Sequence, residues 1–522
     1  MSLFSRARQA LARIIAPPRD AKRAFNGAQM GRLYSQWITT ATSADAEIRR
    51  DIRRLIDRSR DLERNNDYQR GFLLSAQRNI LGAHKYDLRS DAGEWVSKKQ
   101  GGKTSVEWQP DAMAKRMIEE AWIEWGKKGI CTVDRKHNWR SVKRLAVRSV
   151  IRDGNFLARK IVGAQAGNPF GFALQIWEID HLDIYRYGKS DEGNEIRFGI
   201  EFDSNHAPVA FWLRARHPGD FYENASTSAG FTTTRFPADE IYHLFLEDRA
   251  EQSIGYPWIV SAITRLRQLG AFEEAACIAA RIGASKVGFF KKTAGDAPGT
   301  YEGETDANGH PVLDAAPGSF EELPDGWDLA SWSPEYPNIE TGDFRKAMLR
   351  GVCSSLGVSY TTLGNDLESV NFSSARVGLF DEREGWKELQ LFFAEGLFEP
   401  IFADWLEAAI MNGALNLPLG KFAKFNRPVF KARRWAFIDP LKDITAAQIG
   451  IQLRTTSRRQ IIEEQGGDVD EVFHDNLDDE NLAESIGLDL GEPDDPEPPD
   501  PNAPEEDDAA STPPAKKAPP AS

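Results

Sequence analysis

The chain has 522 residues, of which 41% are hydrophobic and 28% are charged, and its formal net charge is −14 at pH 7. This composition is typical of a soluble globular protein with several domains, and no apolar run approaches the ~18 to 20 residues that a membrane span requires. Because a protein that grips DNA by its phosphates normally carries a basic surplus, the acidic charge argues against tight DNA binding.

The three cysteines, Cys131, Cys277 and Cys353, lie far apart in the sequence and never form a C-x-x-C pair. This spacing excludes a disulfide framework and a cysteine zinc site, and it suits a reducing compartment. We expect no metal centre and no cofactor.

The N-terminal arm, residues 1–34, is basic and weakly amphipathic. It lacks the continuous apolar core of a secretion signal. We expect this arm to order against a partner, and a helix that lies on a lipid surface is the alternative.

Residues 43–82 predict a helical stretch, because apolar residues recur there at helical spacing. The residues that carry this pattern are Ile48, Ile52, Leu55, Ile56 and Leu62. Its many arginines could bind nucleic acid. They alternate, however, with Asp51, Asp57 and Asp61, which is typical of a solvated helix face with internal ion pairs.

The stretch SKKQGGKTS, residues 97–105, ends like the phosphate-binding loop of an ATPase. Three residues occupy its G-K-[ST] positions: Gly102, Lys103 and Thr104. The glycine that such a loop needs five positions earlier is Ser97 here, and neither a buried strand nor a helix flanks the stretch. Because Trp95 and Trp108 flank a Gly-Gly centre, the sequence predicts a β-hairpin and no nucleotide site.

Two helices are predicted next, over residues 111–129, with Asp111 near the start and Gly129 at the end, and over residues 138–154. From about residue 155 to residue 243 the pattern changes to strands separated by Gly, Asn, Asp and Pro turns. The predicted strands are NFLARKIV, FALQIWEI, EIRFGIEF, PVAFWLRARH and EIYHLFL.

Asp180, His181 and Asp183 form the one cluster that suggests metal ligands. In an extended segment, alternation would place Asp180 and Leu182 on one face and His181 and Asp183 on the other. One His and one Asp make half a metal site at best, so we expect a solvated strand face.

The second half of the chain predicts a long helix over residues 256–286, with small residues that would permit close helix contacts. A Gly/Pro-rich insert with short strands follows over residues 287–340, and then a second helix over residues 341–357. After a polar stretch, residues 374–413 are helical and rich in aromatic residues, which could pack in the core or form an interface. Residues 437–473 are helical with a break at Gly466 and Gly467.

The C-terminal tail, residues 491–522, holds nine acidic residues, two lysines and ten prolines, and almost no large apolar side chain. Such a tail cannot fold on its own. It could repel packed DNA, bind an assembly partner or aid solubility, and the last is our expectation.

Several stretches follow one another in a specific order between about residues 35 and 485. They are IDRSRDLERNNDYQRGFLLSAQRNILG, WEIDHLDI, GIEFDSNHAPVAFWL, EIYHLFLEDRAEQSIGYPWI, LGVSYTTLGNDLESVNFSSARVGLFDEREGW and WAFIDPLKDITA, followed by a Gly-Gly-Asp segment. The fifth contains an Asn-aromatic-Ser-Ser-x-Arg signature made by Asn371, Phe372, Ser373, Ser374 and Arg376. This collinear set resembles bacteriophage portal proteins of the lambda family.

The resemblance implies an α+β, portal-type fold assembled as a ring, usually of twelve subunits. Its parts would be a mixed α/β wing, a helical stem, a small α/β clip and a helical crown. The corresponding ranges are the arm at 1–34, the wing at 35–255, the first stem helix at 256–286, the clip at 287–340, the second stem helix at 341–357, a tunnel loop at 358–373, the long wing helix and return at 374–439, the crown at 440–490 and the tail at 491–522.

The resemblance also implies a non-enzymatic role at one vertex of the capsid, in a particle assembled in the bacterial host cytoplasm. Double-stranded DNA would enter and leave through the ring. The clip would dock the terminase motor, which is a separate chain, and later a head-completion or adaptor protein, and the crown would face the capsid or scaffold protein inside.

A conduit must hold DNA weakly enough that it slides. Polar residues of the tunnel loop would keep DNA off the wall: Thr361, Thr362, Asn365, Asp366, Glu368 and Asn371. Basic residues of the two stem helices would either guide the DNA backbone or form intersubunit ion pairs. They are Arg265, Arg267, Arg281, Lys286, Arg345, Lys346 and Arg350.

Two other functions compete with the portal. One is another ring component of the virion, such as a connector or baseplate protein, although the order of long helix, insert, second helix and polar loop is not expected there. The other is a nucleotide hydrolase or nuclease, which rests on Lys103, Thr104 and the cluster around His181.

Overall fold

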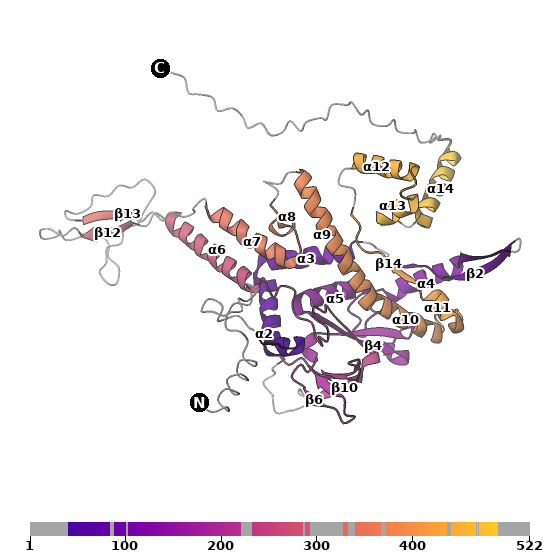
Figure 1. The fold of residues 1–522 in the computed structure, drawn as a ribbon, viewed down its shortest axis with the longest axis horizontal. Helices are drawn as coiled ribbons and strands as arrows, with labels where there is room; N and C mark the ends of the chain where they lie inside the picture. Colours follow the sequence, from indigo (N-terminus) through magenta and orange to yellow (C-terminus); the bar gives the residue numbers. More distant parts are fainter. Residues whose placement is uncertain are drawn as a thin grey trace, which may run out of the picture. The chain divides into compact units, whose positions relative to one another are not determined.

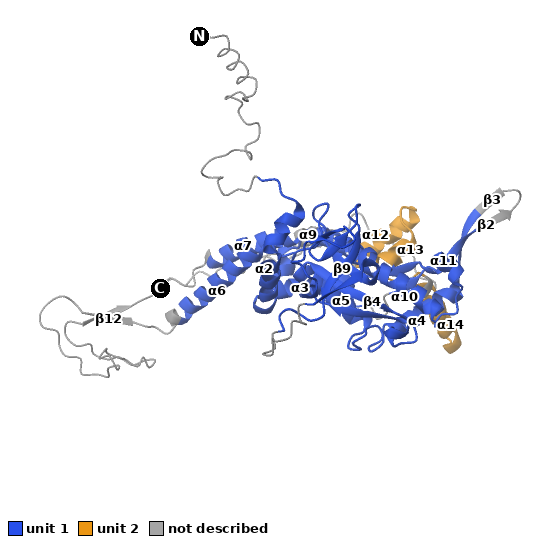
Figure 2. Cartoon of the chain, turned by 90° about the horizontal axis from the view of Figure 1, so that it is seen from below, with its two compact units in different colours: residues 1–433 blue, residues 434–522 orange. Residues whose placement is uncertain are grey.

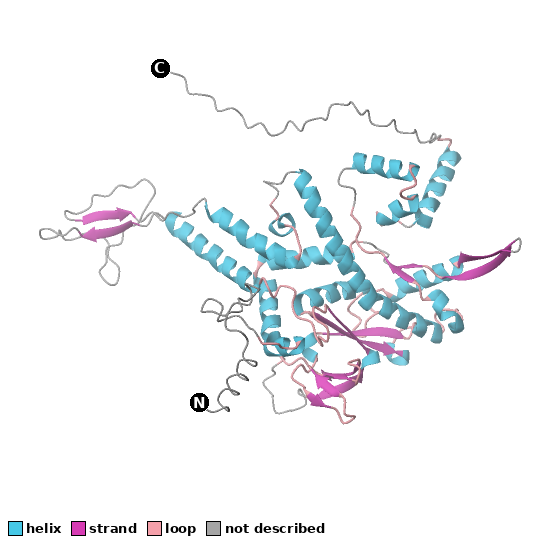
Figure 3. Cartoon of the chain, in the orientation of Figure 1, coloured by secondary structure: helices cyan, strands magenta, loops and turns pink. Residues whose placement is uncertain are grey.

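The computed structural model describes residues 40–83, 88–100, 103–220, 232–284, 288–292, 327–331, 340–366, 372–435, 440–465, 467 and 469–488. The chain divides into two compact units, Met1–Arg433 and Arg434–Ser522 (Figure 2). Helices and strands are mixed throughout the first unit, as expected for an α+β fold (Figures 1 and 3). Among the described helices, none is long and apolar enough to span a bilayer.

The predicted helical stretch of residues 43–82 is two helices, α2 (Ala44–Asn65) and α3 (Asp67–Leu81). They separate at Asn66, which has an extended backbone and whose side chain accepts a hydrogen bond from the backbone N–H of Gln69. Asn is a strong N-cap residue, so the Asn-Asn pair begins a second helix instead of continuing the first.

The next two helices are α4 (Ala112–Trp125) and α5 (Trp139–Asp153). Their N-caps are Asp111 and Asn138, each of which accepts a hydrogen bond from a backbone N–H of the first turn. The predicted end of the first of these helices at Gly129 is wrong: α4 stops at Trp125, and residues 126–130 form turns.

The hairpin predicted around the Gly-Gly centre is confirmed, because β2 (Gly93–Gln100) pairs antiparallel with β3 (Lys103–Pro110). Trp95 lies opposite Trp108, and their ring centroids are 5.3 Å apart. A phosphate-binding loop would require a strand that leads into a helix, so residues 97–105 do not have that architecture.

Two antiparallel sheets follow. The first has the order β11–β4–β5, from Ile241–Phe245, Asn155–Val162 and Phe172–Trp177. The second has the order β10–β9–β8–β7–β6, from Thr233–Pro237, Pro208–Arg214, Ile200–Phe202, Glu195–Arg197 and Gly188–Lys189. Of these strands, β6 and β10 were not predicted from the sequence.

The predicted strand EIRFGIEF is in fact two strands, β7 and β8. Phe198 and Gly199 turn the chain between them with φ of 50° and 74°. A Cβ on Gly199 would lie 2.7 Å from the carbonyl oxygen of Asp183, so the turn requires glycine at that position.

The core of the first unit forms where α2 covers the strands. Ile48, Ile52 and Ile56 are buried against apolar residues of these sheets, among them Leu157 and Phe211. The helical pattern read from the sequence is therefore the stripe that α2 turns toward the core.

We predicted that the arginines of α2 lie on a solvated helix face, but two of them also pair with buried carboxylates. Arg53 pairs with Asp57 on its own helix, as expected, but it also pairs with the buried Asp180. Arg60 binds Asp180 with Nη2 to Oδ2 at 2.6 Å and Asp153 with Nε to Oδ1 at 2.9 Å. Ion pairs to buried carboxylates thus tie the arginine-rich helix to the end of α5 and to the 3₁₀ helix that follows β5.

Glu201 in β8 is buried and accepts hydrogen bonds from Arg235 and Asn194. Hydrogen bonding from Arg235 lowers the pKa of Glu201 to about 2, against the opposing effect of burial. Because the folded-state pKa is lowered, the stabilisation from this pair is present above pH ~4.3, the usual pKa of Glu, and is lost as the pH falls toward 2.

We therefore expect the free energy of unfolding to fall between pH 4.3 and 2, and part of that fall to disappear in Glu201→Gln. The measurement is the urea midpoint as a function of pH. As a control, Glu195→Gln changes an exposed carboxylate in the neighbouring strand. An equally steep fall in Glu201→Gln and in the natural chain would contradict the prediction.

The helical second half of the first unit begins with α6 (Ile263–Ala284), which starts seven residues later than predicted because residues 258–262 form turns. The other elements are β12 (Gly288–Lys292), β13 (Trp327–Ser331), α7 (Glu340–Leu356), α8 (Tyr360–Gly364), α9 (Phe372–Phe393), the π-helix η7 (Ala394–Phe398), α10 (Glu399–Met411), α11 (Phe422–Phe425) and β14 (Pro428–Phe430). The strand β14 returns to pair with β1 (Leu88–Ser90).

The long helical segment predicted over residues 374–413 is confirmed as α9, η7 and α10 in unbroken succession. Most of its aromatic residues pack in the core: Trp386, Phe393, Phe398, Phe402 and Trp405 are buried. Phe380 is 47% exposed. The interpretation that these aromatic side chains pack in the core is therefore correct for most of them.

The second unit contains α12 (Pro440–Gln452), α13 (Arg458–Glu464) and α14 (Val469–Ile486). This agrees with the predicted helices and with a break near Gly467. The acidic tail, residues 491–522, and the arm, residues 1–34, lie outside the described residues.

Candidate functional site

The helices α6 and α7 pack side by side as an antiparallel pair (Figures 1 and 2). Ser261, just before α6, donates its hydroxyl to that of Ser355 near the end of α7 at 3.0 Å. Farther along the pair, the rings of Phe272 and Phe344 have centroids 4.9 Å apart. The two helices lie within two residues of the ranges predicted to be helical, 256–286 and 341–357, apart from the later start of α6.

The base of the pair is fixed to α2 by a small apolar cluster. It contains Leu62, Ile259, Ala262, Ile263, Leu266 and Val352. Tyr68 of α3 adds a polar contact, donating its hydroxyl to Glu273 of α6 at 3.2 Å. Burial and the Glu273 carboxylate raise the pKa of Tyr68 to about 12, so its hydroxyl stays protonated at neutral pH.

Beyond this base, no residue of α6 up to Arg281 is fully buried by the described part of the chain. Residues 270–281 are all exposed or half-buried, and Ile278 is 48% exposed. Of the alanines in this part, Ala271 and Ala275 are exposed. The outer part of the helix pair therefore presents free surface.

A contact between α6 and α7 explains why residue 351 is a glycine. A Cβ on Gly351 of α7 would lie 1.4 Å from Nη1 of Arg265, so the guanidinium lies directly on the glycine backbone. A side chain at position 351 would push Arg265 from its place.

The predicted basic residues of the stem lie mostly on the surface. Arg265, Arg267, Arg281, Arg345 and Arg350 are exposed, and none of the five forms an ion pair with a described carboxylate. Lys346 is half-buried and pairs with Asp366 at 3.5 Å, and the Arg350 guanidinium lies 5.8 Å from the centroid of the Tyr360 ring. Lys286 lies outside the described residues.

The predicted tunnel loop, residues 358–373, is not wholly a loop. Ser359 caps the short helix α8 by accepting a hydrogen bond from the Thr362 N–H at 3.2 Å, and Thr361 and Thr362 are in that helix. Asn365 ends it with a left-handed backbone, φ 49°, which Asn tolerates better than most residues. Glu368 and Asn371 lie outside the described residues.

Asp366 differs from our expectation of a free acidic residue that repels DNA. It accepts a hydrogen bond from the Tyr360 hydroxyl at 3.2 Å and pairs with Lys346. These contacts fold the end of the segment back toward α7, and they neutralise part of the charge that we assigned to the loop wall.

Glu382 of α9 anchors the beginning of the same segment. Its Oε2 accepts from the Ser359 N–H at 3.1 Å and from the Thr362 hydroxyl at 2.9 Å, and its Oε1 accepts from the Trp386 indole N–H at 3.0 Å. With 7% of its surface exposed, Glu382 is the buried residue that holds α8 to α9.

Neither Glu382 nor Gly351 was predicted as a functional residue from the sequence. A glutamate four residues before a tryptophan on a helix is a signal that could have found Glu382, because i and i+4 side chains meet. No local pattern marks Gly351, because the side chain that requires a glycine there, Arg265, lies 86 positions earlier in the sequence. The signature residues Phe372, Ser373, Ser374 and Arg376 form the first turns of α9, and their side chains are not described.

Asp180, His181 and Asp183 were predicted to lie on a solvated strand face, and this prediction is wrong. Asp180 and His181 belong to the 3₁₀ helix η4 (Ile179–His181), because the chain turns there instead of extending. Asp183 instead pairs with Arg214 at 2.6 Å, and His181 Nδ1 lies 2.9 Å from the carbonyl oxygen of Arg214.

Around Asp180, the ligand atoms of Glu178, Asp180 and His217 lie within 4.8 Å of one another. The Asp180 carboxylate already accepts hydrogen bonds from two guanidinium groups, those of Arg53 and Arg60. Burial would raise the pKa of Asp180, but these hydrogen bonds outweigh it and hold the pKa far below its usual value. A carboxylate so bound is a structural anion, and we assign no metal to it.

The family of the chain is shown by comparison with known protein families. Residues 30–390 match the family described as phage portal protein, lambda family. The chain belongs to the lambda family of phage portal proteins. Its function is therefore that of a portal, a structural component of the phage particle.

Individual portal proteins are also similar over nearly the whole chain. A probable portal protein of Halomonas phage phiHAP-1 is 30% identical over 470 residues, which are 89% of this chain and 88% of the relative. Portal protein B of Escherichia phage lambda is 20% identical over 494 residues, covering 86% and 87%. Among solved structures, a chain from the neck of a native GTA particle covers 80% of this chain at 12% identity, with a TM-score of 0.44.

Proposed function

We propose that this portal chain assembles as a closed ring, the twelve-subunit ring implied by the family, at one vertex of the capsid. Double-stranded DNA passes through its centre during packaging and ejection. The carrying observation is the family match across residues 30–390, which includes both helices of the α6–α7 pair and the segment between α7 and α9. Assembly takes place in the host cytoplasm.

Two features of the helix pair support its role as the stem. Among the described residues, none of positions 270–281 is fully buried, so neighbouring copies would have a surface to pack on. In a closed ring, each subunit uses one face against a different face of the next. The five exposed arginines supply positive charge on helices of an otherwise acidic chain.

In this arrangement the residues 287–340 form the clip. The strands β12 and β13 pair antiparallel at its base, with Gly288 opposite Ser331 and Lys292 opposite Trp327. We propose that the clip docks the terminase motor and afterwards a head-completion protein, and that the second unit is the crown facing the capsid or scaffold protein.

Electron microscopy of the purified full-length chain tests the assembly. We expect rings with a central hole and a projecting stem, whose subunits can be counted. A chain that stays monomeric under assembly conditions would overturn the proposal. A flat, thin ring without a stem would favour another connector or baseplate component instead.

The exposed stem arginines should make weak contacts with DNA phosphates. Binding of a short duplex to the assembled ring at low salt should depend on the logarithm of salt concentration, and Arg345→Gln should reduce that slope by about 0.9 for each phosphate that is no longer neutralised. Arg116→Gln is the control, because Arg116 is exposed on α4. Failure of the ring to assemble in Arg345→Gln would instead favour an intersubunit ion pair.

A further inference from the structure

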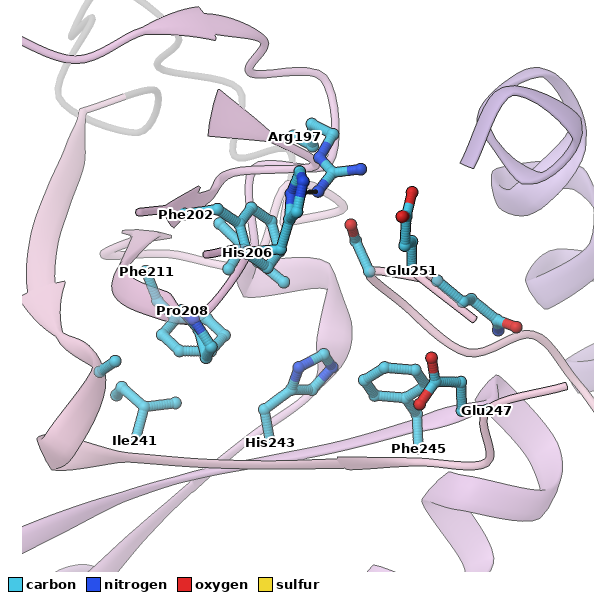
Figure 4. Close-up of a pocket in the computed structure, with 14 residues that line it drawn as sticks. Arg197, Phe202, His206, Pro208, Phe211, Ile241, His243, Phe245, Glu247 and Glu251 are labelled. Carbon is cyan, nitrogen blue, oxygen red and sulfur yellow. Dashed lines mark hydrogen bonds between the residues drawn. The ribbon is translucent and has the colours of Figure 1, made fainter. Parts of the chain in front are cut away.

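A pocket of about 420 Å³ opens between the two sheets of the first unit. Figure 4 shows Phe202, Phe211 and Pro208 on one side of it and Ile241, His243 and Phe245 on the other. Its walls are therefore mainly apolar and aromatic. A volume of this size lies in the range of sites that accept a bulky group.

His243 does not add charge to this wall at neutral pH. It is half-buried, and its Nε2 lies 3.1 Å from Oδ1 of Asn155, to which it donates. Burial lowers the pKa of His243 to about 4. The pocket interior is thus neutral and suits an apolar or aromatic occupant.

The mouth of the pocket is acidic on the side of residues 247–251. Glu247 and Glu251 are both exposed, and neither carboxylate is bonded to any residue in the described part of the chain. Arg197 also lines the mouth, where it is hydrogen-bonded to His206 at 3.1 Å (Figure 4) and forms an ion pair with Asp45. The open carboxylates would favour an occupant that carries positive charge beside its apolar group.

The start of α2 and the residues just before it are held next to this mouth. The carbonyl of Thr42 accepts from Nη2 of Arg249 at 2.9 Å, and Asp45 accepts from the backbone N–H and hydroxyl of Ser253, which lines the pocket. Trp37 is five residues before Thr42, so it can reach ~17 Å from that anchor.

Residues 33–38, with the sequence LYSQWI, have the matching chemistry. They combine Leu33, Tyr34, Trp37 and Ile38, and Arg32 precedes them. Over residues 1–39 there are seven basic residues and one acidic residue, so the segment is strongly basic beside an acidic mouth.

We propose that residues 33–38 of the same chain dock in this pocket, with Trp37 in its apolar interior and Arg32 near Glu247 and Glu251. The docked segment would close the gap between the two sheets and fix the arm to the wing. The inference does not depend on the ring or on passage of DNA.

The test uses the full-length chain with p-benzoylphenylalanine in place of Trp37, which keeps an aromatic group and forms cross-links to nearby C–H bonds on irradiation. We expect cross-links to peptides that contain β9 or β11. Chains labelled with ¹⁵N are mixed with unlabelled chains before assembly, so mass spectrometry identifies which copy supplied each peptide. Cross-links within one copy support the proposal.

Three results would overturn it: no cross-link, cross-links to other elements, or cross-links between labelled and unlabelled copies. The double variant Glu247→Lys/Glu251→Lys should lower the yield about three- to tenfold, as expected for two surface ion pairs. The control Glu388→Lys/Glu407→Lys reverses two exposed charges elsewhere in the same unit and should leave it unchanged. An unchanged yield in the first variant would also contradict the proposal.

Discussion

Asp180→Ala should lower the free energy of unfolding by about 3 kcal/mol, because breaking a buried ion pair leaves the remaining charge uncompensated. The remaining charges would be the guanidinium groups of Arg60, whose side chain is 14% exposed, and of Arg53, which is 37% exposed. Arg60 keeps Asp153 as a partner, which is why the expected loss is at the lower end for such pairs. Urea-induced unfolding measures it.

The matched control is Asp57→Ala, which removes a partly exposed partner of the same Arg53. That i, i+4 pair should be worth less than about 0.5 kcal/mol. Equal losses in the two variants would show that the buried network contributes no more than a surface pair.

The same network predicts a dependence on pH. The pKa of Asp180 is lowered in the folded chain, so its stabilisation is present above the usual Asp pKa of about 3.9 and is lost as the pH falls below it. The difference in free energy of unfolding between the natural chain and Asp180→Ala should therefore be constant near neutral pH and shrink in acid.

Glu382→Ala should release the segment between α7 and α9 and strongly reduce the DNA packaged into particles, while rings still assemble. The substitution removes the acceptor for the Ser359 N–H, the Thr362 hydroxyl and the Trp386 indole. A hydrogen bond to a charged group contributes ~1.5 to 3 kcal/mol, so amide hydrogen exchange in residues 359–364 should accelerate at least about tenfold.

Two measurements separate the possible results of this substitution. Hydrogen exchange reports whether the segment is released, and the amount of protected DNA reports whether the release matters. Glu384→Ala is the control, since Glu384 is 70% exposed and pairs only with Lys387 among the described residues. Faster exchange with normal packaging would contradict the assignment of residues 358–373 to the channel. Failed assembly would favour their placement in a subunit interface.

The order of helices and strands could be read from the sequence because each depends on local patterns. The apolar spacing of α2, the Asn138 cap of α5 and the aromatic run of α9 to α10 all act within a few turns of chain. The same holds for the β2–β3 hairpin, where a Gly-Gly centre between two tryptophans was enough to reject a phosphate loop.

The errors lie where distant residues decide the local structure. Asp180 has the pattern of a solvated strand, but two arginines more than 100 residues away bury it in a 3₁₀ helix. In the polar stretch after α7, the caps of α8 are local, but its attachment to α9 depends on Glu382, which binds Ser359 and Thr362 from outside it.

The sequence by itself therefore determined most of the elements, the acidic charge and the resemblance to portals, all of which are carried by neighbouring residues or by composition. Only the tertiary structure decided which charges are paired, which glycine has to accommodate a guanidinium, and where a pocket opens beside the arm. The physical reason is that hydrogen bonds and ion pairs act over a few ångströms in space, whatever the separation along the chain.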